Sequence, residues 1–159
     1  MTVQVRQPLR EVTISLPRRE GTMAEMIRKV DYCYTTAPDK PGEGARLLEV
    51  LRLADVNLLA FHGFPSARKA QIDFVPADAL AFVAAAKRAK IKLSKPKAAF
   101  LIQDEDRVGA LADLMAKLTA AKVNVTAVTG ICAGAGRFGG LLWVKPRDVR
   151  KAAAALGAT

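Results

Sequence analysis

Long apolar runs are missing from this sequence, and cysteine, histidine and the aromatic residues are scarce. No stretch approaches the roughly 18 consecutive apolar residues of a membrane-spanning helix, so we expect no membrane span. The first ten residues lack the apolar core of a signal peptide, and we expect no secretory leader. Two cysteines, Cys33 and Cys132, cannot form a disulfide framework, which favours a protein of the reducing cytoplasm.

The composition indicates a folded chain with a real core. The 159 residues are 51% hydrophobic and 25% charged, which is typical of globular proteins and is long enough for one ordinary domain or two small ones. Only 6% of the residues are aromatic, and alanine supplies much of the apolar content. We therefore expect small helices packed closely on sheets.

The net charge of +10 raises the question of a nucleic-acid partner. The net positive charge is +3 in residues 1–30, +3 in residues 31–96 and +4 in residues 97–159, so the basic residues are spread along the chain. One dense run, residues 87–97, holds six cations in eleven residues. This run continues a helical pattern into a linker. It therefore favours a solvent-exposed helix end over a surface that binds nucleic-acid phosphates.

An internal repeat organises the chain. Residues 39–63 align with residues 106–130 at an offset of 67, with ten of 25 positions identical and no gap. After a short insertion the alignment resumes and pairs Pro76 with Pro146 and Asp78 with Asp148. The chain is therefore predicted to contain two copies of one structural unit.

The first copy predicts the element order β-α-β-β-α-β, a split βαβ unit. Val30, Tyr32 and Tyr34 alternate with more polar residues at the period of a strand, and apolar residues at three- and four-residue steps predict a helix over residues 44–54. A strand pair, a second helix and a short fourth strand are predicted at residues 56–64 and 70–75, 79–89, and 91–93.

The second copy repeats this order and then lacks a fourth strand. Its elements are predicted at residues 98–102, 108–121, 124–132, 138–144 and 148–156, after which the sequence ends. The N-terminal residues 2–5 and 12–16 also look like strands. Residues 1–16 could fill the vacant edge of the second sheet. Alternatively, residues 1–22 are only a tail, and translation starts at Met23 or Met26.

The predicted fold class is therefore α+β. Two ferredoxin-like βαββαβ units follow one another, each an antiparallel sheet with helices on one face. The predicted division is an N-terminal extension at residues 1–28, a first unit at residues 29–95 and a second unit at residues 96–159.

The turn Asp39-Lys40-Pro41-Gly42, followed by Asp55-Val56-Asn57-Leu58, resembles the ACT domain family. The second copy matches as Asp106-Arg107-Val108-Gly109, followed by Lys122-Val123-Asn124-Val125, with Val108 in place of the proline. The resemblance covers about 130 residues and implies a non-enzymatic, regulatory, tandem ACT protein. It also implies an amino acid effector bound at an interface between units, a homodimer and no cofactor.

Elementary chemistry agrees with an effector site at these turns. Each turn leads into a helix N-terminus, whose free N–H groups and dipole suit a carboxylate, and a glycine lets a ligand approach the backbone. An asparagine offers both a donor and an acceptor to an α-amino acid. The same residues could instead serve only turn geometry and helix capping. The candidate effector-binding residues are Asp39, Lys40, Pro41, Gly42, Asn57, His62, Asp106, Gly109 and Asn124. The first turn is favoured, because the second is acidic.

Three weaker signals are set aside. Residues 134–139 spell the dinucleotide-binding pattern G-x-G-x-x-G, but a strand rather than a helix follows, so a hairpin loop is predicted. Cys33, Cys132 and His62 do not stand at metal-ligand spacing. His62 also has no orienting partner in the sequence that would favour nucleophilic catalysis.

The alternative function is RNA binding. RNA-recognition motifs share the β-α-β-β-α-β order, and the basic and aromatic residues of the strand at 137–143 faintly resemble their signature. Most of the stacking aromatics are absent, so a small-molecule effector is the preferred partner.

Overall fold

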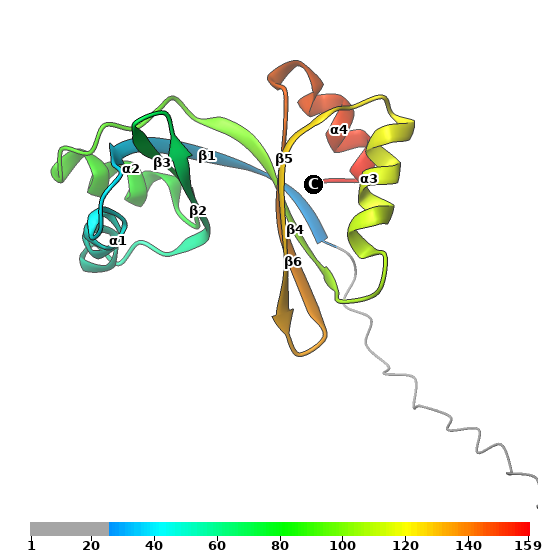
Figure 1. The fold of residues 1–159 in the computed structure, drawn as a ribbon, viewed down its shortest axis with the longest axis horizontal. Coiled ribbons are helices and arrows are strands. Elements are labelled where there is room, and N and C mark those ends of the chain that lie inside the picture. The colour runs from blue at the N-terminus through cyan, green and yellow to red at the C-terminus, as the bar shows by residue number, and fades with distance from the viewer. Residues whose placement is uncertain (1–25) are drawn as a thin grey trace, which may run out of the picture.

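The computed structural model describes residues 26–159, which form the elements predicted for this part of the chain in the predicted order, apart from the strand at residues 91–93 (Figure 1). The first half contains β1 (Met26–Pro38), α1 (Glu43–Leu53), β2 (Leu58–Ser66), β3 (Lys69–Pro76) and α2 (Ala79–Arg88). The second half contains β4 (Lys97–Glu105), α3 (Ala110–Ala120), β5 (Val125–Gly134), β6 (Arg137–Val144), the short 3₁₀ helix η1 (Pro146–Asp148) and α4 (Val149–Leu156).

The strands form a single antiparallel sheet in the order β2-β3-β1-β4-β6-β5. The long strand β1 belongs to both halves: its residues 33–38 pair with β3, and its residues 26–32 pair with β4 (Figure 1). The α+β fold class with ferredoxin-like units is thus confirmed, and the strands of the two units join edge to edge.

All four α-helices cover the same face of this sheet. In β1, Ile27 packs in the core beneath α3 and α4, whereas Cys33 and Ala37 pack in the core beneath α1 and α2. Because successive side chains of a strand point to opposite faces, these odd-numbered residues share one face. Val30 and Tyr32 lie on the opposite face, which we call the helix-free face.

Each half buries its own core between helices and sheet. In the first half, Leu47 and Leu51 of α1 and Phe82 of α2 meet Phe74 of β3. In the second half, Leu114 and Leu118 of α3 and Leu156 of α4 meet Phe100 and Leu142 of the sheet. Full burial of each such side chain contributes about 1.5–3 kcal/mol.

A third buried cluster lies on the helix-free face and joins the halves. Val75 of β3 and Ala60 of β2 pack with Leu101, Leu141 and Trp143 of the second half. Strands in a sheet twist relative to one another, and here the helix-free faces of the two halves turn toward each other (Figure 1).

The repeat extends to backbone conformation. Gly42 and Gly109 precede α1 and α3 with left-handed φ values of 92° and 85°. Asp55 and Lys122, also an equivalent pair, have φ values of 54° and 53°. The two copies therefore share their turns as well as their element order.

The predicted fourth strand of the first unit is wrong, because the structure assigns no strand at residues 91–93. The segment still runs beside β1: Ser94 N donates to Tyr34 O at 2.8 Å, and Thr35 Oγ1 donates to Lys92 O at 2.8 Å. The Tyr34 N–H, however, donates to the side-chain Oγ of Ser94 at 3.0 Å. A side chain thus takes one ladder position, and regular pairing stops.

The edge of β4 that the sequence left vacant is occupied by residues 26–32 of β1. Thr159 also bonds to this part of β1, with its N–H donating to Ile27 O at 3.1 Å and its O accepting from Lys29 N at 2.8 Å. Residues 1–16 lie outside the described residues, so their pairing with the second sheet stays a prediction, as do the domain boundaries at 28/29 and 95/96.

Candidate functional site

The first predicted effector turn, at residues 39–42, is exposed between β1 and α1. Gly42 is the N-cap of α1, and no atom lies within 4 Å of the position that a Cβ would take there. Lys40 Nζ lies 3.6 Å from Glu43, the first residue of the helix, and Arg46 donates to the same carboxylate at 3.0 Å. The hydrogen bond from Arg46, reinforced by Lys40, lowers the pKa of Glu43.

The second turn is also open at its glycine and lies beside a cavity of about 340 Å³. Asp104, Arg107, Asp113 and Lys117 line this cavity, and Arg107 donates to Asp113 at 2.6 Å. Asp106 and Gly109 precede α3, and Asn124 is exposed before β5, as Asn57 is exposed before β2 in the first half.

The structure does not bring the two turns together. In the antiparallel pair of β1 and β4, Met26 lies opposite Gln103 and Tyr32 lies opposite Lys97. One turn follows the C-terminal end of β1 and the other follows the C-terminal end of β4, so they lie at opposite ends of the central strand pair. Each turn keeps its asparagine in its own half.

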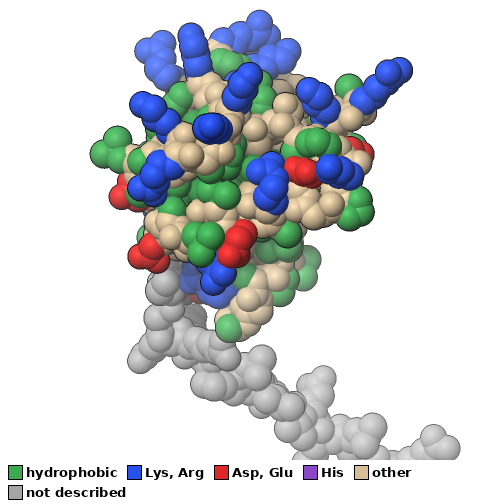
Figure 2. Space-filling model, turned by 90° about the vertical axis from the view of Figure 1, so that its left-hand side faces the viewer, with side chains coloured by type: hydrophobic (Ala, Val, Ile, Leu, Met, Phe, Trp, Pro, Cys, Tyr) green, Lys and Arg blue, Asp and Glu red, His purple; other side chains and the backbone are tan. Residues whose placement is uncertain are grey.

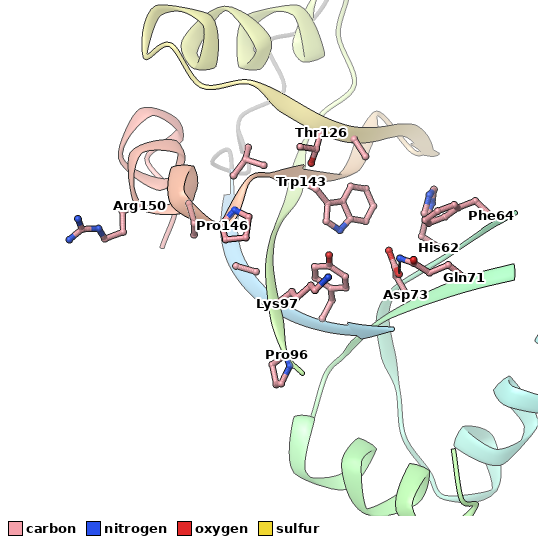
Figure 3. A pocket seen from close by; sticks show the side chains of 15 residues that line it. His62, Phe64, Gln71, Asp73, Pro96, Lys97, Thr126, Trp143, Pro146 and Arg150 are labelled. Carbon is pink, nitrogen blue, oxygen red and sulfur yellow. Dashed lines mark hydrogen bonds between the residues drawn. The ribbon is translucent and has the colours of Figure 1, made fainter. Parts of the chain in front are cut away.

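A larger cavity, of about 770 Å³, lies on the helix-free face where the two halves meet (Figure 3). Strands of both halves line it, so it does not exist in either half alone. Among the predicted effector residues, only His62 lines it. Its other side chains include Tyr32, Phe64, Gln71, Asp73, Lys97, Thr126, Trp143, Pro146 and Arg150.

Two buried polar side chains face this cavity. Trp143 is 6% exposed, and its Nε1 has no hydrogen-bond partner among residues 26–159. Asp73 is 4% exposed and accepts from Gln71 Nε2 at 2.9 Å. In Figure 3 the nitrogen edge of the Trp143 indole is turned toward the part of the cavity that holds Asp73.

Aromatic rings form much of the cavity wall. The ring of Trp143 lies 5.3 Å from that of His62 and 6.3 Å from that of Tyr32, centroid to centroid. The ring of Phe64 lies 5.2 Å from that of His62. The first half thus supplies three rings and the second half supplies the indole. Neighbouring rings are inclined at 46° to 86° to one another, so they form an angled apolar wall beside the polar groups.

Burial shifts the acid–base behaviour of two cavity residues. Desolvation raises the pKa of Asp73, although the hydrogen bond from Gln71 and the charges of His62 and Lys97 oppose this change. Desolvation and the nearby Asp73 carboxylate raise the pKa of the Tyr32 hydroxyl. Lys97 Nζ lies 4.7 Å from the ring centre of Tyr34, which keeps this cation beside the cavity.

No sequence motif marks Tyr32, Asp73 or Lys97 as site residues, and Trp143 belongs only to the motif behind the RNA alternative. One signal was present in the sequence: Asp73 interrupts an otherwise apolar run of Ile72, Phe74 and Val75. The structure buries this part of the strand on both faces. A carboxylate in such a position is unusual enough to mark a candidate site.

The side chains behind the RNA alternative are not available for stacking. Phe138 packs beneath the helices at 9% exposure, and Trp143 is buried at the cavity. Figure 2 shows Lys and Arg side chains scattered over the face in view, with Asp and Glu among them. Neither Phe138 nor Trp143 therefore offers an exposed ring of the kind on which RNA-recognition motifs stack bases.

The remaining sequence signals have structural explanations or no counterpart. The glycine pattern at residues 134–139 forms the predicted hairpin, in which Gly134, Ala135 and Gly136 all have positive φ. Within residues 26–159, no three His, Cys, Asp or Glu side chains gather where they could hold a metal ion. No helix in this part of the chain is long and apolar enough to cross a membrane.

No protein-family model and no curated protein sequence matches the chain. Solved structures do match. Protein BT0572 from Bacteroides thetaiotaomicron superposes with a TM-score of 0.67 at 19% identity, covering 84% of this chain and 88% of that one.

Regulatory subunits of aspartate kinase share the fold as well. The subunit from Thermus thermophilus, in its ligand-free form, gives a TM-score of 0.58 at 13% identity, covering 87% of this chain and 97% of that one. The subunit from Thermus flavus gives 0.56 at 13% identity, with the same coverage of 87% and 97%. The chain therefore has the ACT-like fold that its turn motifs imply.

Proposed function

We propose that this protein is a non-enzymatic regulatory protein of the cytoplasm that binds an amino acid effector at its β–α turns. The observation that carries the proposal is the repeated open turn: Gly42 and Gly109 stand at helix starts with positive φ and free space above them. The likeness in fold to regulatory subunits supports a regulatory role.

The turn chemistry suits an α-amino acid. The N-terminus of α1 attracts the ligand carboxylate, and Lys40 adds a cation beside it. Asn57 supplies a donor and an acceptor for the ligand's amino and carboxylate groups. The first turn is the better candidate, because Asp104, Glu105 and Asp106 would repel a carboxylate at the second.

An effector that bridges two turns requires a second protomer, since the turns of one chain lie apart. We therefore propose a homodimer, in which a turn of one protomer faces a turn of its partner. The outer strands β2 and β5 are the sheet edges within residues 26–159, and such edges invite pairing with another copy. Light scattering at micromolar concentration should report twice the chain mass; the mass of a single chain would contradict the dimer.

Regulation would follow from the bridging geometry. A ligand held between two protomers favours one arrangement of the dimer, and a protein that contacts the dimer then responds to ligand concentration. No bond needs to be made or broken in the effector.

The test is a thermal-shift screen of the twenty amino acids. A ligand present at about 100 times its Kd adds roughly 2.7 kcal/mol to the free energy of unfolding. Gly42→Val and Asn57→Ala should each abolish the shift while the protein remains folded. Gly44→Ala is the matched control, because Gly44 lies inside α1 in open space. Wild-type shifts in both turn variants would contradict the proposed site.

A further inference from the structure

The cavity on the helix-free face holds a buried donor without an acceptor. Trp143 Nε1 has no partner among the described residues, and an unsatisfied buried donor of this kind costs about 1–3 kcal/mol. Such groups are rare in folded proteins. The indole nitrogen edge faces the open space of the cavity (Figure 3), so an oxygen of a bound molecule could accept from it.

The same cavity holds a buried carboxylate with unused capacity. Gln71 donates to Oδ1 of Asp73 at 2.9 Å, and an ionised carboxylate can accept about four hydrogen bonds. A buried carboxylate calls for a compensating cation. A ligand ammonium can supply both the charge and several N–H donors.

We propose that this cavity is a ligand site of its own, for a small zwitterion with an apolar, ring-sized body. The ligand ammonium binds Asp73, and a ligand carboxylate accepts from Trp143 Nε1 beside the cation of Lys97. The apolar body packs against the rings of His62 and Phe64. The site shares no residue with the turns at 39–42 and 106–109, so it does not depend on the function proposed for them.

The cavity is large enough for a small molecule, and the charged and polar groups that line it narrow the class of ligand. The volume of about 770 Å³ is within the range of small-molecule sites, roughly 300–1,000 Å³. A simple anion would meet the buried Asp73 carboxylate, whereas a simple cation would leave Trp143 Nε1 unpaired. A molecule that carries both charges on a ring-sized body satisfies both groups and covers the aromatic wall.

The lone tryptophan makes the site directly observable. Because Trp143 is the only tryptophan in the sequence, its fluorescence reports on this cavity and on no other part of the chain. The full-length protein is titrated with phenylalanine, with phenylethylamine, which lacks the carboxylate, and with hydrocinnamate, which lacks the amine. Phenylalanine should change the emission in a saturable way and bind at least about tenfold more tightly than either analogue. Equal binding of an analogue, or no response to phenylalanine at millimolar concentration, would overturn the proposal.

Two variants test the assigned roles by calorimetry. Asp73→Asn removes the charge and should weaken phenylalanine binding about tenfold or more, and Trp143→Phe removes the donor and should weaken it about threefold to tenfold. Asp78→Asn is the matched control: it makes the same chemical change outside the cavity, where asparagine can still cap α2. Wild-type affinity in Asp73→Asn would overturn the site.

The outcome separates this site from the turn site. A thermal shift that disappears in Gly42→Val, with no change in Trp143 emission, would support the proposed function and overturn the cavity site. A saturable emission change that is lost in Asp73→Asn and kept in Gly42→Val would support the cavity site, whatever happens at the turns.

Discussion

Asp31 of β1 lies directly opposite Ala98 of β4, and these two residues occupy equivalent positions in the two repeats. They are 67 residues apart, which is the offset of the repeat. The pairs on either side, Val30 with Ala99 and Tyr32 with Lys97, exchange places under the same offset. The two copies therefore meet through the same surface, as the subunits of a two-fold symmetric dimer do, within a single chain.

The hairpin of β5 and β6 yields a sharp prediction for two adjacent glycines. A Cβ on Gly140 would lie 2.9 Å from the carbonyl oxygen of Thr129, whereas the nearest atom to a Cβ on Gly139 is 3.9 Å away. Gly140→Ala should therefore lower the free energy of unfolding by about 1–3 kcal/mol. Gly139→Ala should change it by less than about 0.5 kcal/mol or raise it slightly. Urea denaturation measures both, and equal stabilities of the two variants would contradict the prediction.

The start of α1 offers a second matched pair. Gly42 has a φ of 92°, so Gly42→Ala should destabilise the protein by about 1–2 kcal/mol although space for the methyl group is open. Gly44 lies in the helix, where alanine should stabilise by about 0.4–1 kcal/mol. Thermal melts of the two variants should therefore move in opposite directions. A shift of the same sign in both would show that backbone conformation does not govern this turn.

Helix capping distinguishes two aspartates that the repeat aligns. Asp78 accepts from Leu80 N at 2.9 Å and from Ala81 N at 3.0 Å, whereas Asp148 makes no side-chain cap at α4. Asp78→Ala should cost about 0.5–2 kcal/mol, and Asp148→Ala should cost less than about 0.5 kcal/mol. Denaturant titration of both variants checks this difference. Equal losses of stability would mean that both aspartates cap their helices equally well, which would contradict the prediction.

Burial of Asp73 predicts a pH-dependent stability. Because its pKa is raised in the folded state, the folded protein binds the proton more readily than the unfolded chain does. Asp73 therefore lowers stability progressively as the pH rises above the ordinary pKa of an aspartate. Asp73→Asn should melt close to wild type near about pH 4 and a few degrees above it near about pH 7. A variant that melts below wild type at neutral pH would contradict this sign.

Local patterns were sufficient to predict the helices and most strands, because amphipathic periodicity and turn residues are local properties. They misled in β1. Val30, Tyr32 and Tyr34 form the more apolar stripe of that strand, yet the helices cover the stripe that contains Ile27, Cys33 and Ala37. Both faces of β1 are covered, one by helices and part of the other by the opposite half, so period-two alternation could not identify the helix side.

The two candidate sites also differ in how far the sequence predicts them. The turns at Gly42 and Gly109 were visible in the sequence because a short motif in one segment creates each of them. The cavity was not visible in the sequence, because Asp73 and Trp143 are 70 residues apart. They line the same cavity only because the shared sheet twists. Local patterns carry no information on how far a sheet twists.

Val108 takes the position that Pro41 has in the first copy, and this difference has a consequence for how such a protein can evolve. In a dimer of identical chains, every substitution at a turn appears twice and must suit both copies of the site. With both copies encoded in one chain, a mutation alters a single turn and leaves its twin untouched. One copy can then lose its affinity for a ligand, acquire a different specificity or serve only as a scaffold, while the other copy keeps its ligand-binding role.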